Sequence, residues 1–126
     1  MNSEELKNRT KMFAIACAKL CIDLSPNIVN KVYSNQLIRC SSSVGANYRA
    51  AVRAKSSADF INKLKIVEEE LDESLFFLEL INEFNPTFSN RIETIYNEGE
   101  QLLKIFVSSI QTARNNQKKN PINLKS

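Results

Sequence analysis

The residues of this chain whose types and spacing could do chemistry are mostly charged. Carboxylates gather at positions 68–73, where five of the six residues are acidic. Paired carboxylates can act as general acid and base or bind a divalent metal. Helical bundles that bind two irons, however, combine such carboxylates with a Glu-x-x-His motif, and this sequence has no histidine. Glu69 and Glu73, four residues apart, are therefore expected to lie on a solvated helix face.

The absence of histidine also excludes Ser-His-Asp and Cys-His catalysis, and zinc sites that need imidazole. The three cysteines, Cys17, Cys21 and Cys40, have no evident fourth ligand and cannot form a disulfide framework. Reduced thiols in the cytoplasm are expected. Apolar runs such as 12–18 and 74–81 are too short and interrupted to cross a membrane. We therefore expect no enzyme activity, no metal, no cofactor and no membrane partner.

Charge is distributed unevenly along the chain, although the net charge is only +3. Residues 25–65 hold seven basic and one acidic side chain, a net charge of +6. Residues 66–100 hold one basic and ten acidic side chains, a net charge of −9, and residues 101–126 hold five basic and none acidic. Either antiparallel neighbours neutralise these blocks, or a basic surface stays free for an anionic partner.

The elements that must position these side chains are predicted to be helices. Only two glycines and three prolines interrupt the chain, and apolar residues recur at helical spacing in four stretches. Ser25-Pro26 predicts a capping serine followed by a proline in the first helical position. Further breaks are expected at 55–57 and at Asn85-Pro86. The prediction is an all-α, antiparallel up-down-up-down four-helix bundle in one domain over 1–114, with helices at about 3–24, 26–54, 58–84 and 88–114 and a flexible polar tail at 115–126.

Two of these helices carry more apolar surface than a lone four-helix bundle needs. The second has a face that includes Ser41 and Gly45, opposite its apolar seam, where small residues would admit another backbone. The third is apolar nearly all round at 75–84, and Phe76 points away from the seam. This surplus favours association with another subunit or partner. A tightly wrapped monomer with exposed aromatic side chains is the alternative.

Outward-facing cations are the candidates for binding an anionic partner. Arg49 is the strongest candidate, because it is expected to point outward. Arg39 and Arg53 lie on the flank of the seam, where either can meet the acids at 68–73. A structural role is expected for Asn47, a seam amide that fixes register or bonds a neighbouring helix. The residues expected to bind nucleic acid are Arg49, Arg53, Lys55, Lys63, Lys65, Arg114, Lys118 and Lys119, and those expected to be structural are Arg39, Asn47, Glu70 and Glu73.

Residues 36–74, QLIRCSSSVGANYRAAVRAKSSADFINKLKIVEEELDES, resemble the small bacterial four-helix-bundle proteins known as ribosomal RNA intervening-sequence proteins. The resemblance rests on S-V-G-A-N at 43–47, on R-A at 53–54, on D-F at 59–60, and on the acids that end at Ser74. The chain departs from the family pattern at four places. Glutamates are common in the family at Ala50 and Lys55, a polar residue is common at Val52, and a Tyr-Trp pair is common at Phe76 and Phe77.

The family is similar to the accessory protein of diversity-generating retroelements, which forms a barrel-shaped pentamer and binds reverse transcriptase and nucleic acid. The resemblance therefore implies an antiparallel bundle that assembles as a homopentamer. Together with the basic blocks at 25–65 and 101–126, the resemblance favours a non-enzymatic protein that binds RNA, DNA or a ribonucleoprotein partner through its basic surface. The alternative is a protein-interaction scaffold whose basic surface docks on an acidic protein.

Overall fold

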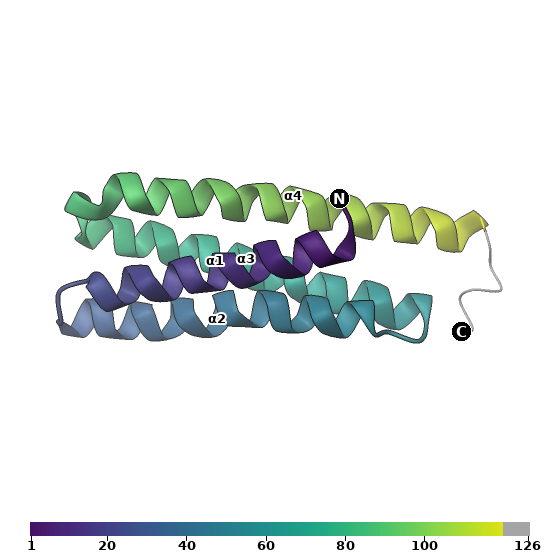
Figure 1. The fold of residues 1–126 in the computed structure, drawn as a ribbon, viewed down its shortest axis with the longest axis horizontal. Helices are drawn as coiled ribbons and strands as arrows, with labels where there is room; N and C mark the ends of the chain where they lie inside the picture. The colour runs from purple at the N-terminus through teal and green to yellow at the C-terminus, as the bar shows by residue number, and fades with distance from the viewer. Residues whose placement is uncertain (120–126) are drawn as a thin grey trace.

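The fold is a bundle of four long antiparallel helices, seen in a computed structural model that describes residues 1–119 (Figure 1). Helix α1 spans Ser3–Asp23, α2 spans Ile28–Val52, α3 spans Ser57–Phe84 and α4 spans Ser89–Lys119, with a short 3₁₀ helix, η1, at Pro86–Phe88. Each helix packs against the next in the chain, and α4 closes the bundle against α1. The predicted all-α, up-down-up-down architecture is confirmed.

Side-chain caps begin the helices α1 and α3 as their sequences predict. The Asn2 Oδ1 atom accepts a hydrogen bond from the Glu5 backbone N–H at 2.9 Å, and the Asn2 amide donates to the Glu5 carboxylate at 3.2 Å. The Ser56 Oγ atom accepts from the Asp59 backbone N–H at 3.0 Å. These bonds satisfy N–H groups in the first turn that have no partner within the helix.

The start of α2 differs from the prediction. Asn27, and not Ser25, is the cap, and its Oδ1 atom accepts from the Asn30 backbone N–H at 2.8 Å. Pro26 therefore lies in the connection. The reason is tertiary: the buried Asn30 side chain donates to the Ser25 carbonyl at 2.9 Å and exchanges two hydrogen bonds, of 2.8 and 3.0 Å, with Asn85 at the end of α3.

Helix α4 is longer than predicted. Residues 115–119, assigned to a flexible tail from their polar composition, are helical. Ala113 and Gln117 remain partly buried there, and Gln111 donates to the Asn115 side chain at 3.1 Å, one turn further on. The remainder of the predicted tail, 120–126, lies outside the described residues.

The second face of α2 packs in large part against α1 within the monomer. Ser41 is fully buried, and α1 crosses so near that a Cβ atom on Gly45 would lie 3.2 Å from the Thr10 Oγ1 atom. Contact with α1 therefore covers most of the extra small and apolar surface predicted for α2. On α3 the surplus remains, since Phe76 and Phe84 are exposed.

Replacement of Gly99 is expected to weaken the core. A Cβ atom at this position on α4 would lie 2.8 Å from Leu75 Cδ2 on α3 and 3.0 Å from Phe13 Cε1 on α1. Overpacking typically costs about 1–3 kcal/mol, whereas the gain in helix propensity is about 1 kcal/mol. Urea denaturation of Gly99→Ala should show a net loss, whereas Asn97→Ala, on the exposed face of the same helix, should not. A Gly99→Ala protein as stable as the wild type would contradict this packing.

The buried thiol of Cys17 is expected to make stability depend on alkaline pH. Burial raises the pKa of Cys17 to about 12. Because the unfolded thiol ionises above about pH 8.5, its contribution is complete below that pH and is lost as pH rises toward 12. In this window the free energy of unfolding should fall by about 1.4 kcal/mol per pH unit more in the wild type than in Cys17→Ala. Urea denaturation at about pH 8 and about pH 10 measures the difference. Equal slopes in the two proteins would contradict the assignment.

Candidate nucleic-acid interface

The alternating direction of the helices brings cations from both basic blocks of the sequence to one end of the bundle. The start of α1, the end of α2, the start of α3 and the end of α4 all point toward that end (Figure 1). Each predicted nucleic-acid-binding residue is on one of these segments or, for Arg53 and Lys55, in the connection between α2 and α3. We call this set the basic end: Arg49, Arg53, Lys55, Lys63, Lys65, Arg114, Lys118 and Lys119.

The cations of the basic end are accessible and free of ion pairs. Lys63 is partly buried and the others are exposed. Within residues 1–119, none of them lies within ion-pair distance of a carboxylate. The sequence predicts either neutralisation of the basic blocks by neighbouring helices or a free basic surface. At this end of the bundle the basic surface is free.

Neutralisation applies at particular contacts elsewhere in the bundle. Arg39 on α2 forms ion pairs with Glu70, at 3.5 Å, and with Glu73 on α3. Burial and the neighbouring Glu73 raise the pKa of Glu70, while Arg39 opposes that rise. Two more pairs, Arg9–Glu98 at 2.6 Å and Arg91–Asp23 at 2.7 Å, join α1 to α4. The structure thus places Arg39 against the acids and leaves Arg53 beyond them.

Asn47 makes its hydrogen bonds within its own helix. Its amide donates to the Ser43 carbonyl at 2.9 Å and to the Ser43 hydroxyl at 2.8 Å. The side chain is partly buried, and among the described residues it reaches no neighbouring helix. The buried amides that join the start of α2 to the end of α3 are instead Asn30 and Asn85, a pairing that no local pattern in the sequence predicts.

A cleft beside the basic end adds cations that the sequence analysis missed. It has a volume of about 480 Å³ and lies between the first half of α1 and the last two turns of α2. We call it the basic cleft; its lining residues are Glu4, Lys7, Asn8, Lys11, Arg49 and Arg53. Lys7 and Lys11 stand one helical turn apart, but only the packing of α1 on α2 shows that they face the two arginines.

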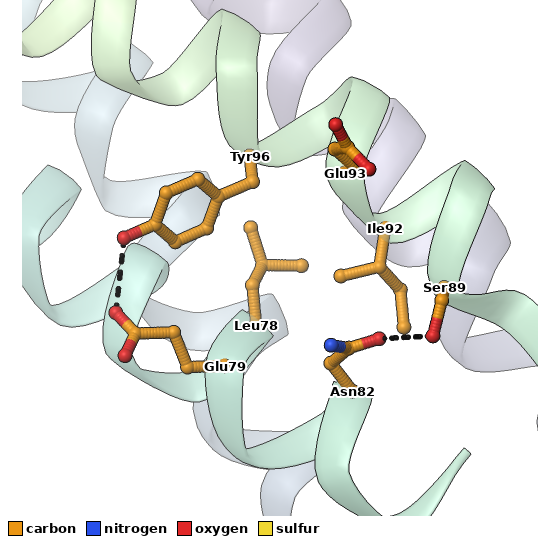
Figure 2. Close-up of a pocket in the computed structure, with 7 residues that line it drawn as sticks. All are labelled: Leu78, Glu79, Asn82, Ser89, Ile92, Glu93 and Tyr96. Atoms are coloured by element: carbon orange, nitrogen blue, oxygen red, sulfur yellow. Dashed lines mark hydrogen bonds between the residues drawn. The ribbon is translucent and has the colours of Figure 1, made fainter. Parts of the chain in front are cut away.

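A smaller hollow between α3 and α4, of about 260 Å³, offers no catalytic arrangement (Figure 2). The Tyr96 hydroxyl donates to Glu79 at 3.0 Å, and the Ser89 hydroxyl donates to the Asn82 side-chain oxygen at 2.8 Å. Burial, followed by the bond to Glu79, raises the pKa of Tyr96. Two pairs of polar side chains therefore bond to each other across the hollow, and the volume is below the 300–1,000 Å³ or so of typical ligand pockets.

Metal and thiol chemistry find no support in the described part of the chain. No group of three or more carboxylate or cysteine side chains converges there in a way that could hold a metal ion. Burial raises the pKa of Cys21 and of Cys40, which keeps both thiols protonated near neutral pH. Across residues 1–119, every helix is too short or too polar to traverse a bilayer.

Comparison with known proteins places this chain in a family. The family model described as 23S rRNA-intervening sequence protein matches residues 4–108. A crystal structure from Bacteroides thetaiotaomicron VPI-5482, of a protein with unknown function from the S23 ribosomal protein family, is similar with a TM-score of 0.77. It is 33% identical in sequence over 88% of this chain and 99% of that chain. No curated protein matches this sequence. The chain belongs to the 23S rRNA-intervening sequence protein family.

Proposed function

We propose that this protein is a non-enzymatic helical bundle that binds RNA, alone or within a ribonucleoprotein, through its basic end. The observation that carries the proposal is the gathering of unpaired cations from the ends of α2 and α4 and the start of α3, while Glu70 and Glu73 of α3 pair with Arg39 instead. Free cysteines support a cytoplasmic location.

Phosphate contacts explain how such a surface would bind. Each lysine or arginine that neutralises a phosphate releases condensed counterions, so affinity grows with the number of cations that one RNA can reach. Arginine adds a fork of donors that matches two phosphate oxygens. Arg114 and Lys118, one turn apart near the end of α4, would contact neighbouring phosphates in this way.

RNA binding is expected to depend steeply on salt and on the basic end. Fluorescence anisotropy with a structured RNA, over about 50 to 200 mM salt, should give a linear fall of log K with log salt. The Arg114→Ala/Lys118→Ala variant should reduce that slope by about 1.4 to 1.8. Lys19→Ala/Lys104→Ala removes the same charge from positions outside the basic end and should leave the slope unchanged.

Absent or salt-independent RNA binding by the wild type would refute this function. In that case the basic end would favour the alternative, a scaffold that docks on an acidic protein, and a partner retained after nuclease treatment would distinguish the two.

A second proposal, self-association, is favoured by exposed aromatic side chains on α3. Phe76 and Phe84 are 53% and 55% exposed, and Leu80 lies between them at helical spacing. Phe77 and Tyr33 extend this surface onto α2, with ring centroids 6.2 Å apart. We call this surface the aromatic ridge: Phe76, Leu80 and Phe84, with Phe77 and Tyr33 beside them.

We propose that a second copy of the chain covers the aromatic ridge. Carboxylates flank the ridge at Asp72, Glu73, Glu79 and Glu83, so two ridges would repel each other. The complementary surface is a groove of about 630 Å³ at the α1–α2 connection, where Ile22 and Ile28 are 79% and 73% exposed beside Lys31. Contact between these two different surfaces joins the copies head-to-tail. Such copies close into a ring when the rotation from one copy to the next divides a full turn evenly. The homopentamer implied by the resemblance is one such ring.

Removal of the aromatic side chains of Phe76 and Phe84 should dissociate the assembly. Native mass spectrometry of the wild type is expected to show a homopentamer, and Phe76→Ala/Phe84→Ala to show monomers, because the contact loses its two largest exposed side chains. Val107→Ala, which truncates an exposed apolar residue on α4, should remain assembled. A monomeric wild type would refute self-association. An assembled ridge variant would place the contact elsewhere.

A further inference from the structure

We infer that the basic cleft holds the backbone of a single RNA strand, in preference to a duplex, and that it does so without reading bases. This inference rests on the proposed RNA binding and assigns a ligand class and a location to it. It adds Lys7, Asn8 and Lys11 of α1 to the predicted arginines of α2.

The two walls of the cleft present cations at matching intervals. Lys7 and Lys11 are four residues apart on α1, and Arg49 and Arg53 are four residues apart on α2. Four residues of helix rise about 6 Å, comparable to the separation of neighbouring phosphates along an extended strand. Successive phosphates in the cleft would therefore meet a lysine from one wall and an arginine from the other.

The charge of the cleft is largely uncompensated. Lys11, Arg49 and Arg53 form no ion pair within residues 1–119. The only acid in the lining, Glu4, pairs with Lys7 at 3.2 Å, and its side chain is 80% exposed. Exposed pairs contribute about 0–1 kcal/mol, so Lys7 can exchange this partner for a phosphate at little cost.

Close packing of α1 on α2 sets the width of the cleft. The helices approach at Gly45, where a Cβ atom would lie 3.2 Å from Thr10, and the buried Ser41 lies one turn before it. Axes of helices in such contact are about 8–10 Å apart, so the two rows of cations lie close together along the two borders of one cleft. A single strand can enter it and meet both rows, whereas a duplex is a wide convex cylinder that meets only the rim.

No aromatic ring is available in the cleft for stacking on a base. None of its lining residues is aromatic. Tyr48, next to Arg49, is buried and packs on Phe106 with ring centroids 5.3 Å apart. Proteins that read or grip unpaired bases usually stack them on exposed aromatic rings. The contacts therefore go to phosphates, and affinity should depend little on sequence.

The test compares labelled oligouridylate, oligocytidylate and a duplex of equal phosphate number by fluorescence anisotropy across salt concentrations. Both single strands should bind with similar affinity and several-fold more tightly than the duplex. Lys11→Ala/Arg49→Ala, one cation from each wall, should weaken single-strand binding about tenfold and reduce the salt slope by about 1.4. Lys11→Arg/Arg49→Lys keeps both charges and should keep the slope. Lys19→Ala/Lys104→Ala is the matched control for lost charge.

The outcomes separate this inference from the proposed function. If the wild type binds no RNA, the proposed function fails and this inference fails with it. If the wild type binds RNA but the Lys11→Ala/Arg49→Ala variant retains full affinity and slope, only the cleft assignment is overturned. Duplex binding as tight as single-strand binding overturns the ligand class. Lys11 and Arg49 are exposed, so the variants should fold, and circular dichroism verifies that they do.

Discussion

The reversal of chain direction at each of three short connections is the constraint on which the rest of this structure depends. The connections at 24–27, 53–56 and 85–88 are too short to cross the bundle, so each helix must pack antiparallel to the one before it. This alternation brings the end of α2, the start of α3 and the end of α4 together. Like charges meet there, and the negative ends of the α2 and α4 dipoles offset only part of their repulsion. The apolar core, which runs the length of the bundle, must hold the basic end together.

Close approach at two glycines connects this packing to the proposed function. Gly99 lets Phe13 and Leu75 meet over α4, which ties α1 and α3 to the same helix. Gly45 lets α1 approach α2 at Thr10, and the basic cleft lies between the same two helices. The small residues of α2 thus bind nothing themselves. They determine how far apart the cations of two neighbouring helices stand.

Some regions of the molecule have partners within the monomer for their polar and apolar side chains, and others do not. The hollow between α3 and α4 contains two hydrogen bonds between its own side chains, and burial raises the pKa of the Cys21 and Cys40 thiols. The basic end and the aromatic ridge are different, because each keeps groups that the monomer does not use. Phe76 and Phe84 lie on the C-terminal half of α3, away from the basic end. Binding of RNA and contact with another copy would therefore use separate surfaces.

Local signals in the sequence were sufficient for the elements of the fold. The apolar spacing has the period of a helix, and the caps at Asn2 and Ser56 involve residues three positions apart, so both can be recognised without tertiary contacts. The start of α2 could not, because the choice of Asn27 depends on the pairing of Asn30 with Asn85, fifty-five residues away. The end of α4 was missed because polar composition outweighed the partial burial of Gln117.

The sequence by itself determined which cations exist and that they fall into blocks, whereas tertiary structure decided which of them act together. Arg39 and Arg53 have similar positions on the flank of one seam. The register of α2 against α3, in which the Ser74 hydroxyl donates to Cys40 Sγ at 3.2 Å, puts Arg39 beside Glu70 and leaves Arg53 without an ion pair among residues 1–119. Lys7 and Lys11 are far from Arg49 in sequence and carry no local signal of a site. Their role depends on long-range electrostatics and on the packing of α1 against α2, which no pattern within one helix encodes.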